Sequence, residues 1–311
     1  MRTVIRRPTC FTDETPASRV VAPRGRVGDD GGMAVTTVRR PVLRVTPGGV
    51  QGPASTRRPD TLAVEEPLEI RLGDDPFTVT MRTPGHDVEL ALGFLVGEGL
   101  VHGPDDVLGA RHCPDAARGP DGEPTHNIVE VVLAAATAPP PRAVPRRVTS
   151  ACGVCGTDSI DAVRARAAVD VHGDGVTVDP AVLAALPDRL REAQRVFDRT
   201  GGLHAAGLFT PDGDLLAVRE DVGRHNAVDK VVGWAFQQRM LPLRGHVLQV
   251  SGRASFELVQ KAAAAGCPVL AAVSAPSSLA VDLAVDAGLT LVGFSRGASF
   301  NVYAHPHRVR L

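Results

Sequence analysis

Short apolar runs alternate with helical segments from residue 203 to residue 294. The runs read LHAAGLFT, LLAVRED, HVLQV, PVLAAV and LTLVGF, and helical segments of about ten residues separate the last three. Strands joined by helices pair in parallel, because the crossover returns the chain to the same end of the sheet. The pattern therefore predicts a layered α/β core in the C-terminal half.

The region before residue 203 mixes strands and helices less regularly. LEIRLGDDPFTVTMRT alternates apolar and polar residues around Gly73-Asp74-Asp75, which predicts a β-hairpin. TPGHDVELALGFLVGEG predicts a helix with Pro84 in its first turn, and NIVEVVLAAA predicts another strand. We therefore expect a smaller α+β domain before the α/β core.

Residues 179–202, DPAVLAALPDRLREAQRVFDRTGG, have helical spacing. Leu183, Leu186 and Leu190 recur at intervals of three and four. Pro187 lies among them, and proline cannot sit inside a helix without breaking or kinking it. We expect one helix to end there and a second to begin.

Composition divides the chain into four segments. Residues 1–55 are rich in Arg, Pro, Gly, Thr and Asp, so we expect them to be mostly disordered, with Met33 as an alternative native start. Residues 56–150 form the expected α+β domain. Residues 151–165 are expected to form a mobile C-x-x-C loop and a helix start, and residues 166–311 the α/β cofactor-binding domain.

Charge and cysteine content bear on partners and compartment. The formal net charge of −1 gives no overall attraction to nucleic acid or anionic lipid. No apolar run approaches the roughly 18 residues that span a bilayer. Five cysteines are an odd number, and most are isolated, which fits a reducing compartment better than a disulfide framework. We expect a cytoplasmic protein that binds neither nucleic acid nor membrane.

Cys152 and Cys155 form a C-x-x-C pair in VTSACGVCGTDSID. Structural zinc needs four ligands, and the chain has only one such pair. Zinc deaminases need H-x-E and P-C-x-x-C, whereas Ala151 precedes Cys152 and H-x-E is absent. We therefore expect no metal site. A redox couple, a nucleophilic thiol and two buried cysteines stay open, and the small Gly153 and Gly156 favour a nucleophile on a moving loop.

Three predicted strands end in serine-rich loops, namely Ser251–Ser255, Ser274–Ser278 and Ser295–Ser299. In a parallel sheet such loops meet at the carboxyl edge of the strands, where ligands bind. Taken alone, each loop is explained without a ligand, because serine commonly caps helices and occurs in the turns that precede them. Arg253 and Arg296 add forked donors that suit phosphate, so the three loops together predict a phosphate site.

The stretch EDVGRHNAVDK joins a predicted strand to a predicted helix. Arg224 and His225 are candidates to contact a cofactor, because Arg is always charged and His titrates near neutrality. Asn226 is a candidate helix cap. Asp229 and Lys230 are interpreted without a functional role, as part of a solvent-exposed face of the helix.

Six motifs occur in order: TSACGVCG, GGLHAAGLF, EDVGRHNAVDKVVG, SGRASFELVQKAAAAG, SAPSSLAVDLA and GFSRGASFNVYAHPHR. Together they make roughly residues 36–311 closely resemble the FdhD family, the sulfur carrier proteins or accessory sulfurtransferases of formate dehydrogenase. The resemblance implies a cytidine deaminase-like layering of the C-terminal α/β domain, with an added domain.

The same resemblance implies an activity and partners. Members take persulfide sulfur from an L-cysteine desulfurase and deliver it to the molybdenum of the molybdenum bis(guanine dinucleotide) cofactor of formate dehydrogenase. By resemblance, the persulfide cysteine corresponds to Cys152 and Cys155 is its second member. The family's cofactor-binding segment falls on Phe294, Ser295, Arg296, Gly297, Ala298 and Ser299, and the residue patterns add Ser251, Arg253, Arg224 and His225.

The chain departs from the family pattern at one place, and two other functions compete with sulfur transfer. Relatives commonly carry a second basic residue before the Phe-Asn-Val-Tyr run, where this chain has Ala298 and Ser299, which weakens Ser299 as a ligand more than Arg296. The competing functions are a non-catalytic chaperone that presents the cofactor and a zinc or nucleotide deaminase-like enzyme. A homodimer is left open.

Overall fold

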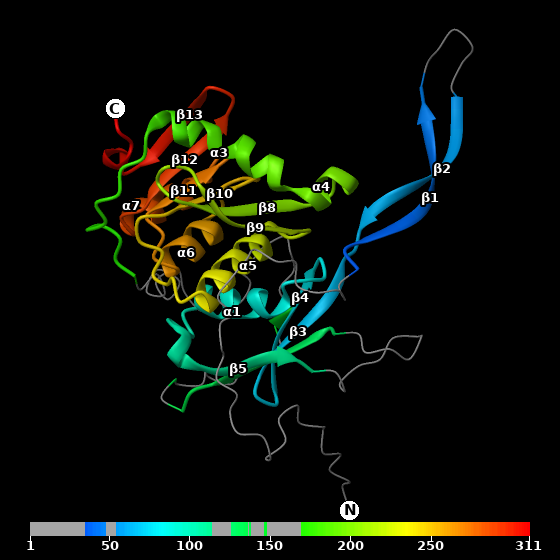
Figure 1. The fold of residues 1–311 in the computed structure, drawn as a ribbon, viewed down its shortest axis with the longest axis horizontal. Coiled ribbons are helices and arrows are strands. Elements are labelled where there is room, and N and C mark those ends of the chain that lie inside the picture. Colours follow the sequence, from blue (N-terminus) through cyan, green and yellow to red (C-terminus); the bar gives the residue numbers. More distant parts are fainter. Residues whose placement is uncertain (1–34, 48–53, 114–125, 136, 138–145, 148–168) are drawn as a thin grey trace, which may run out of the picture.

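The computed structural model describes residues 35–47, 54–113, 126–135, 137, 146–147 and 169–311. The fold is mixed α/β, with a six-stranded sheet, a five-stranded sheet and a separate two-stranded sheet (Figure 1). Over these described ranges, no helix combines the length and apolar character needed to cross a membrane.

The six-stranded sheet contains the alternating region. Its strands are β8 (His204–Phe209), β9 (Leu215–Asp221), β10 (Val247–Val250), β11 (Val269–Ala272), β12 (Thr290–Arg296) and β13 (Ser299–Ala304), in the order β13-β12-β11-β10-β8-β9. β10, β11 and β12 pair in parallel, as the sequence pattern predicts. β8, β9 and β13 pair antiparallel, so the sheet is mixed.

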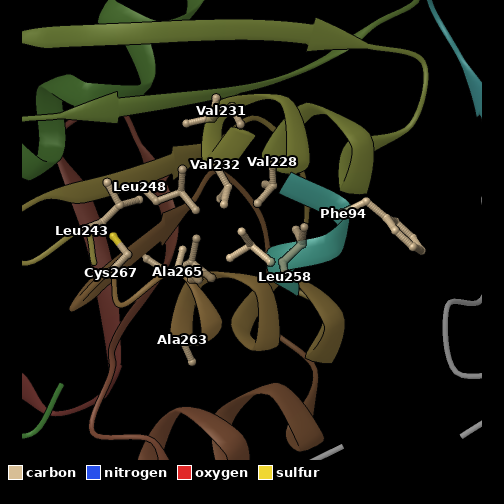
Figure 2. Packing of buried hydrophobic residues seen from close by; sticks show 14 of the residues in the cluster. Phe94, Val228, Val231, Val232, Leu243, Leu248, Leu258, Ala263, Ala265 and Cys267 are labelled. Carbon is tan, nitrogen blue, oxygen red and sulfur yellow. The ribbon is translucent and has the colours of Figure 1, made fainter. Parts of the chain in front are cut away.

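Helices cover both faces of this sheet. Val247 packs on the face covered by α3 (Pro180–Ala193), and Leu248 on the face covered by α5 (Arg224–Gln237), α6 (Phe256–Ala264) and α7 (Ser278–Asp286). Successive strand residues point to opposite faces, so both faces must be apolar when both are covered. Figure 2 shows Leu248 packed with residues of α5 and α6 on the second face. The short η2 (Pro306–Arg308) follows β13.

Helix α3 runs through Pro187 without a break, so the predicted break was wrong. Proline removes the N–H that would bind the carbonyl of Leu183, four residues earlier. The hydroxyl of Ser295 donates to that carbonyl instead, at 3.3 Å. The break comes at Gln194, and α4 (Arg195–Thr200) follows.

The five-stranded sheet comes from the N-terminal half, in the order β5-β6-β3-β4-β7. β3 (Glu66–Leu72) and β4 (Asp75–Arg82) form the predicted hairpin, in which Gly73 adopts φ 56° at the turn. The predicted strand near residue 130 is β6 (Ile128–Leu133). β5 (Val107–His112) and the two-residue β7 (Arg146–Arg147) complete the sheet, and the single turn η1 (Pro104–Asp106) precedes β5.

Helix α1 (Asp87–Gly97) joins the two halves of the molecule. It is the predicted helix, and nearly all of its residues are buried because it lies between the five-stranded sheet and helices α5 and α6. It crosses α5 at two glycines. A Cβ on Gly93 would lie 1.8 Å from the backbone oxygen of Asp229, and one on Gly233 would lie 1.8 Å from that of Glu89. The two expected domains therefore share one hydrophobic core.

Buried charged side chains also make contacts between the halves. Arg219 of β9 donates two hydrogen bonds to Glu89 of α1, at 2.5 and 2.7 Å. Lys230 lies 2.7 Å from Asp221 and donates to the backbone oxygen of Thr83 in the N-terminal half. Because a buried charge left without its partner is costly, the Arg219–Glu89 pair and the hydrogen bond from Lys230 to Thr83 hold the halves in one relative position.

The two-stranded sheet departs from the sequence prediction. β1 (Thr37–Thr46) lies within residues 1–55, which the composition predicted to be mostly disordered, and pairs antiparallel with β2 (Ala54–Ala63). β-branched valines and threonines favour the strand, while arginines and prolines between them hide any apolar period. We call these two strands the arm, because they project from the body (Figure 1).

Candidate functional site

One edge of the six-stranded sheet gathers the predicted cofactor-binding loops. β10, β11 and β12 are parallel, so the loops that follow them lie at the same edge. β8 starts and β9 ends there as well, since His204 is paired with Asp221. The loops touch directly: Ser274 donates its backbone N–H to Gly252 at 3.2 Å, and Phe294 donates its N–H to Ser274 at 3.2 Å.

We call this region the polar edge. Its members are the ends of β8 and β9, the first turn of α5 and the three loops, namely His204, Asp221, Arg224, His225, residues 251–257, residues 274–278 and residues 294–299.

Asp221 anchors the centre of the polar edge. Its carboxylate is fully buried and accepts hydrogen bonds from the backbone N–H groups of Gly223 and Thr83, at 2.8 and 3.1 Å. It also accepts from the side-chain amide of Asn226 at 2.9 Å and pairs with Lys230. These contacts fix the first turn of α5, which carries Arg224 and His225.

Two interpretations of this stretch were wrong. Asn226 lies inside α5, whose N-cap is Gly223, so it is not the predicted cap. Lys230 and Asp229 are each 1% exposed rather than part of a solvated face. Asp229 pairs with Lys261 of α6 at 2.8 Å. The partners come from other elements, so local spacing did not reveal them.

His225 is held among polar groups of α6. Its Nε2 lies 3.2 Å from the hydroxyl of Ser255 and 3.3 Å from a carboxyl oxygen of Glu257. Burial, and then the positive charges of Arg224 and Lys261, lower the pKa of His225 to about 3. Burial likewise raises the pKa of Glu257. His225 is therefore neutral at physiological pH, and it can donate or accept one hydrogen bond without carrying charge.

Glu257 contacts His225, and the sequence patterns did not identify it. An acidic residue in the first turn of a helix is common for helix-dipole reasons alone, so nothing in the sequence marks it. His204 lies beside the same cluster, since a Cβ on Gly252 would come within 3.5 Å of its Nδ1. Burial and the charge of Arg224 lower the pKa of His204. The Nε of Arg224 is buried and has no hydrogen-bond partner in the part of the chain that the structure describes.

The predicted serine donors have different uses. The Ser251 hydroxyl accepts the backbone N–H of Ala205 at 2.9 Å, and the Ser277 hydroxyl caps α7. Ser295 is fully buried, and its hydroxyl is occupied by the Leu183 carbonyl. Arg253, by contrast, is exposed and makes no ion pair with any described residue. The arginine is therefore a freer ligand donor than these serines.

Residues Phe294–Ser299 span the end of β12, a two-residue turn at Gly297 and Ala298, and the start of β13. Phe294 and Gly297 both have positive φ, 52° and 60°, and Arg296 is paired with Ser299 across the turn. The Arg296 guanidinium lies over the Phe294 ring at 5.6 Å from its centroid. A Cβ added to Gly297 would meet no heavy atom of the described chain within 4 Å, so the turn is open to solvent and to a ligand.

The cysteines divide into two groups. Cys152 and Cys155 lie outside the described residues, so their predicted role stays a prediction. Cys267 is free and fully buried, and burial raises its pKa to about 12, which keeps it a thiol. Cys113 is disulfide-bonded, unlike the free thiols expected from the cysteine count. In the described parts of the chain, no group of three or more His, Cys, Asp or Glu is placed to hold a metal ion.

The environment of His225 predicts a pH dependence of stability. Its folded pKa of about 3 lies below the unfolded value of 6.5, so the unfolded chain takes up a proton first as the pH falls. The contribution of His225 is therefore complete above pH 6.5 and is lost as the pH falls toward 3. At pH 4 the loss is at most about 3 kcal/mol.

The measurement is urea unfolding of wild type and His225→Gln at several pH values. We expect the free energy of unfolding to fall less steeply between pH 6.5 and pH 4 in the variant. His102→Gln, at an exposed position, is the control and should follow wild type. Equal slopes for wild type and His225→Gln would show that His225 accepts a proton in the folded state.

Comparisons with known proteins identify relatives over most of the chain. A family model described as the FdhD/NarQ family matches residues 63–310. A protein of Streptomyces avermitilis named "Sulfur carrier protein FdhD" is 57% identical over 282 residues, covering 90% of this chain and 98% of that protein. One of Mycobacterium tuberculosis with the same name is 58% identical over 255 residues, covering 81% and 92%.

A solved structure also aligns with this fold. It is the crystal structure of a protein from Desulfotalea psychrophila provisionally named a formate dehydrogenase accessory protein. The TM-score is 0.68 with 25% sequence identity, over 89% of this chain and 100% of that one.

Proposed function

Because this chain belongs to the FdhD/NarQ family, we propose that it is a sulfurtransferase that carries sulfur on Cys152 for a formate dehydrogenase. Its curated relatives are named sulfur carrier proteins, and the related crystal structure is provisionally named a formate dehydrogenase accessory protein. The names supply the client enzyme and the transferred sulfur, and the resemblance to the family supplies the molybdenum cofactor as the cargo. The residues of this chain supply the chemistry.

Sulfur is accepted from the persulfide of an L-cysteine desulfurase. The Cys152 thiolate attacks the outer sulfur of that persulfide, a Cys152 persulfide forms, and the desulfurase cysteine leaves as a thiolate. The thiolate is the reactive form, so cationic neighbours in sequence such as Arg146 and Arg147 favour the step.

Two routes lead from the Cys152 persulfide to the acceptor. In one, Cys155 stabilises the outer sulfur until the acceptor takes it, the S–S bond breaks, and Cys152 is left as a thiolate. In the other, the Cys155 thiolate attacks the inner sulfur of Cys152, a disulfide forms, and hydrosulfide leaves. The molybdenum bis(guanine dinucleotide) cofactor is the cargo in both routes.

The observation that carries the proposal is the polar edge, in a family whose curated relatives are sulfur carriers. The cargo is a polyanion with guanine dinucleotide phosphates. Arg253 and Arg296 are exposed at the same edge and make no ion pair with a described residue, so their guanidinium groups are available to phosphate. Arg224, His225 and the open turn at Gly297 would shape the same surface, with the backbone N–H groups of the loops as further donors.

Several finer points belong to this proposal. A cytidine deaminase-like layering would describe the α/β half, and the cytoplasm would bring the protein together with its desulfurase. A homodimer is compatible with the proposal but not required by it. A chaperone that only presents the cofactor would use the same polar edge and would need no thiol chemistry.

Sulfur loading tests the proposal. The protein is incubated with an L-cysteine desulfurase and L-cysteine, and its intact mass is measured before and after reduction. Wild type should gain one sulfur atom that a reductant removes, and Cys152→Ala should gain none. Cys267→Ala is the control, since its buried thiol is not a nucleophile. A wild-type protein that gains no sulfur would leave the presenting chaperone as the better function.

A further inference from the structure

The arm has no buried residue, and the contacts that join it to the rest of the described chain lie at its base. Most of its residues are exposed on both faces of the two-stranded sheet. At the base, the Arg199 guanidinium of α4 donates a hydrogen bond to the Thr37 hydroxyl at 3.1 Å. The Val64 N–H donates to the Thr36 oxygen and continues the pairing of the two strands. A lone hairpin is marginally stable in water, so a surface packed against it would stabilise it.

The arm carries five arginines and one carboxylate. The arginines are Arg39, Arg40, Arg44, Arg57 and Arg58, and the carboxylate is Asp60. The register puts arginines on both faces, since residues opposite each other share a face. None of the five makes an ion pair with a residue that the structure describes. The arm therefore presents uncompensated positive charge.

Apolar side chains lie between these arginines. Leu43 is 58% exposed and Val45 is 56% exposed, and Pro41 is paired with Pro59 across the sheet. Arg39, Arg40, Arg57 and Arg58 surround the two prolines and line a shallow hollow with them. Arginine mixed with aliphatic groups is typical of protein–protein interfaces.

The chemistry of the arm favours carboxylates of a protein over nucleic acid. Guanidinium groups bind carboxylates through two parallel hydrogen bonds. Residues 37–63 contain no Phe, Tyr, Trp or His on which a base could stack. Exposed leucine, valine and proline gain nothing from a phosphodiester backbone, but they can be buried against another protein.

The base of the arm lies next to the polar edge. Ala63 lies beside Gly202, since a Cβ on Gly202 would be 3.9 Å from the Ala63 Cβ, and His204 of the polar edge follows two residues later. In Figure 1 the arm leaves the body beside α4. A protein seated on the arm is thus close to the surface that would hold the cargo.

We propose that the arm is the docking surface for an acidic face of the client enzyme, formate dehydrogenase. The identity of the client rests on the proposed function, whereas the charge and exposure of the arm do not. The arm lies next to the polar edge, where the cofactor would be held. A protein docked on the arm is therefore placed to receive the cofactor, and the client enzyme is the protein that receives it.

Binding of full-length protein to purified apo formate dehydrogenase tests the proposal, by biolayer interferometry at two salt concentrations. The Arg57→Glu/Arg58→Glu variant reverses one charge on each face of the arm. We expect its Kd to rise at least about tenfold, because like charges would then face each other across the interface. The matched control is Arg195→Glu/Arg310→Glu, which reverses two exposed arginines outside the arm and should bind as wild type.

The proposal is overturned if the arm variant binds the client as tightly as wild type does, or if wild type does not bind the client. A DNA duplex that binds wild type and not the arm variant, with client binding unchanged, would assign the arm to nucleic acid. A dimer that becomes monomeric only in the arm variant, with client binding unchanged, would assign it to a second copy of the chain.

The result is separable from the proposed function. Sulfur loading from the desulfurase is measured on the same variants. An arm variant that loads sulfur like wild type but fails to bind the client supports docking. If wild type loads no sulfur, the carrier function fails, while the binding comparison still decides the role of the arm.

Discussion

A Gly233→Ala variant is expected to be less stable than wild type by at least about 3 kcal/mol. The sign is informative, because alanine in a helix interior is ordinarily favoured over glycine by about 1 kcal/mol. The added Cβ would lie 1.8 Å from the Glu89 backbone oxygen. That oxygen belongs to α1, which is enclosed by a sheet and two helices and cannot move away without opening the core. Gly93→Ala meets the Asp229 backbone in the same way.

Urea unfolding of Gly233→Ala, Gly93→Ala and wild type measures the effect. Gly175→Ala is the control, because no heavy atom of the described residues lies within 4 Å of its added Cβ and the residue is outside the helices. Its free energy of unfolding should stay within about 0.5 kcal/mol of wild type. A Gly233→Ala protein as stable as wild type would mean that the two helices can separate at little cost.

Loss of Cys152 is expected to have the largest effect on function. In cells without their own copy of this gene, Cys152→Ala should lower formate dehydrogenase activity by at least about a hundredfold, the scale on which removal of a nucleophile acts. The physical reason is that the variant lacks the proposed carrier thiol, and the one free cysteine among the described residues cannot replace it. Cys267 is buried with a pKa of about 12, so it is not a thiolate at neutral pH.

The activity is measured in extracts alongside the abundance of the variant. Equal abundance with lost activity separates chemistry from folding. Cys155→Ala then distinguishes the two delivery routes: it should still load sulfur in both, but it should lose activation only if disulfide formation releases the sulfur. Full activation by Cys152→Ala would refute the carrier mechanism.

The sequence predicted the parts of the fold whose stabilising contacts are local. The strands β10, β11 and β12 are short apolar runs between helices, and their parallel pairing follows from the connections. Pro187 was misjudged because its compensation comes from Ser295, which is distant in the sequence. Lys230 was misjudged because its partners, Asp221 and the Thr83 carbonyl, belong to other elements that pack around it.

The sequence predicted where the candidate site lies better than it predicted which contacts its side chains make. Parallel strands put Arg253 and Arg296 at one edge, and the structure has them there. The sequence did not distinguish hydroxyls that are available from those already used, such as Ser251 and Ser295. Glu257 carried no signal, because its contact with His225 depends on the packing of two helices.

The crossing of α1 and α5 limits how a sulfur atom can be moved. Two helices in contact through glycine backbones, with Arg219 and Glu89 paired beside them, cannot bend about a hinge between the sheets. Shuttling by opening and closing of two lobes is therefore unavailable to this molecule. In the proposed function, sulfur would then pass from donor to acceptor by exchange of one docked protein for the other on a body of fixed shape.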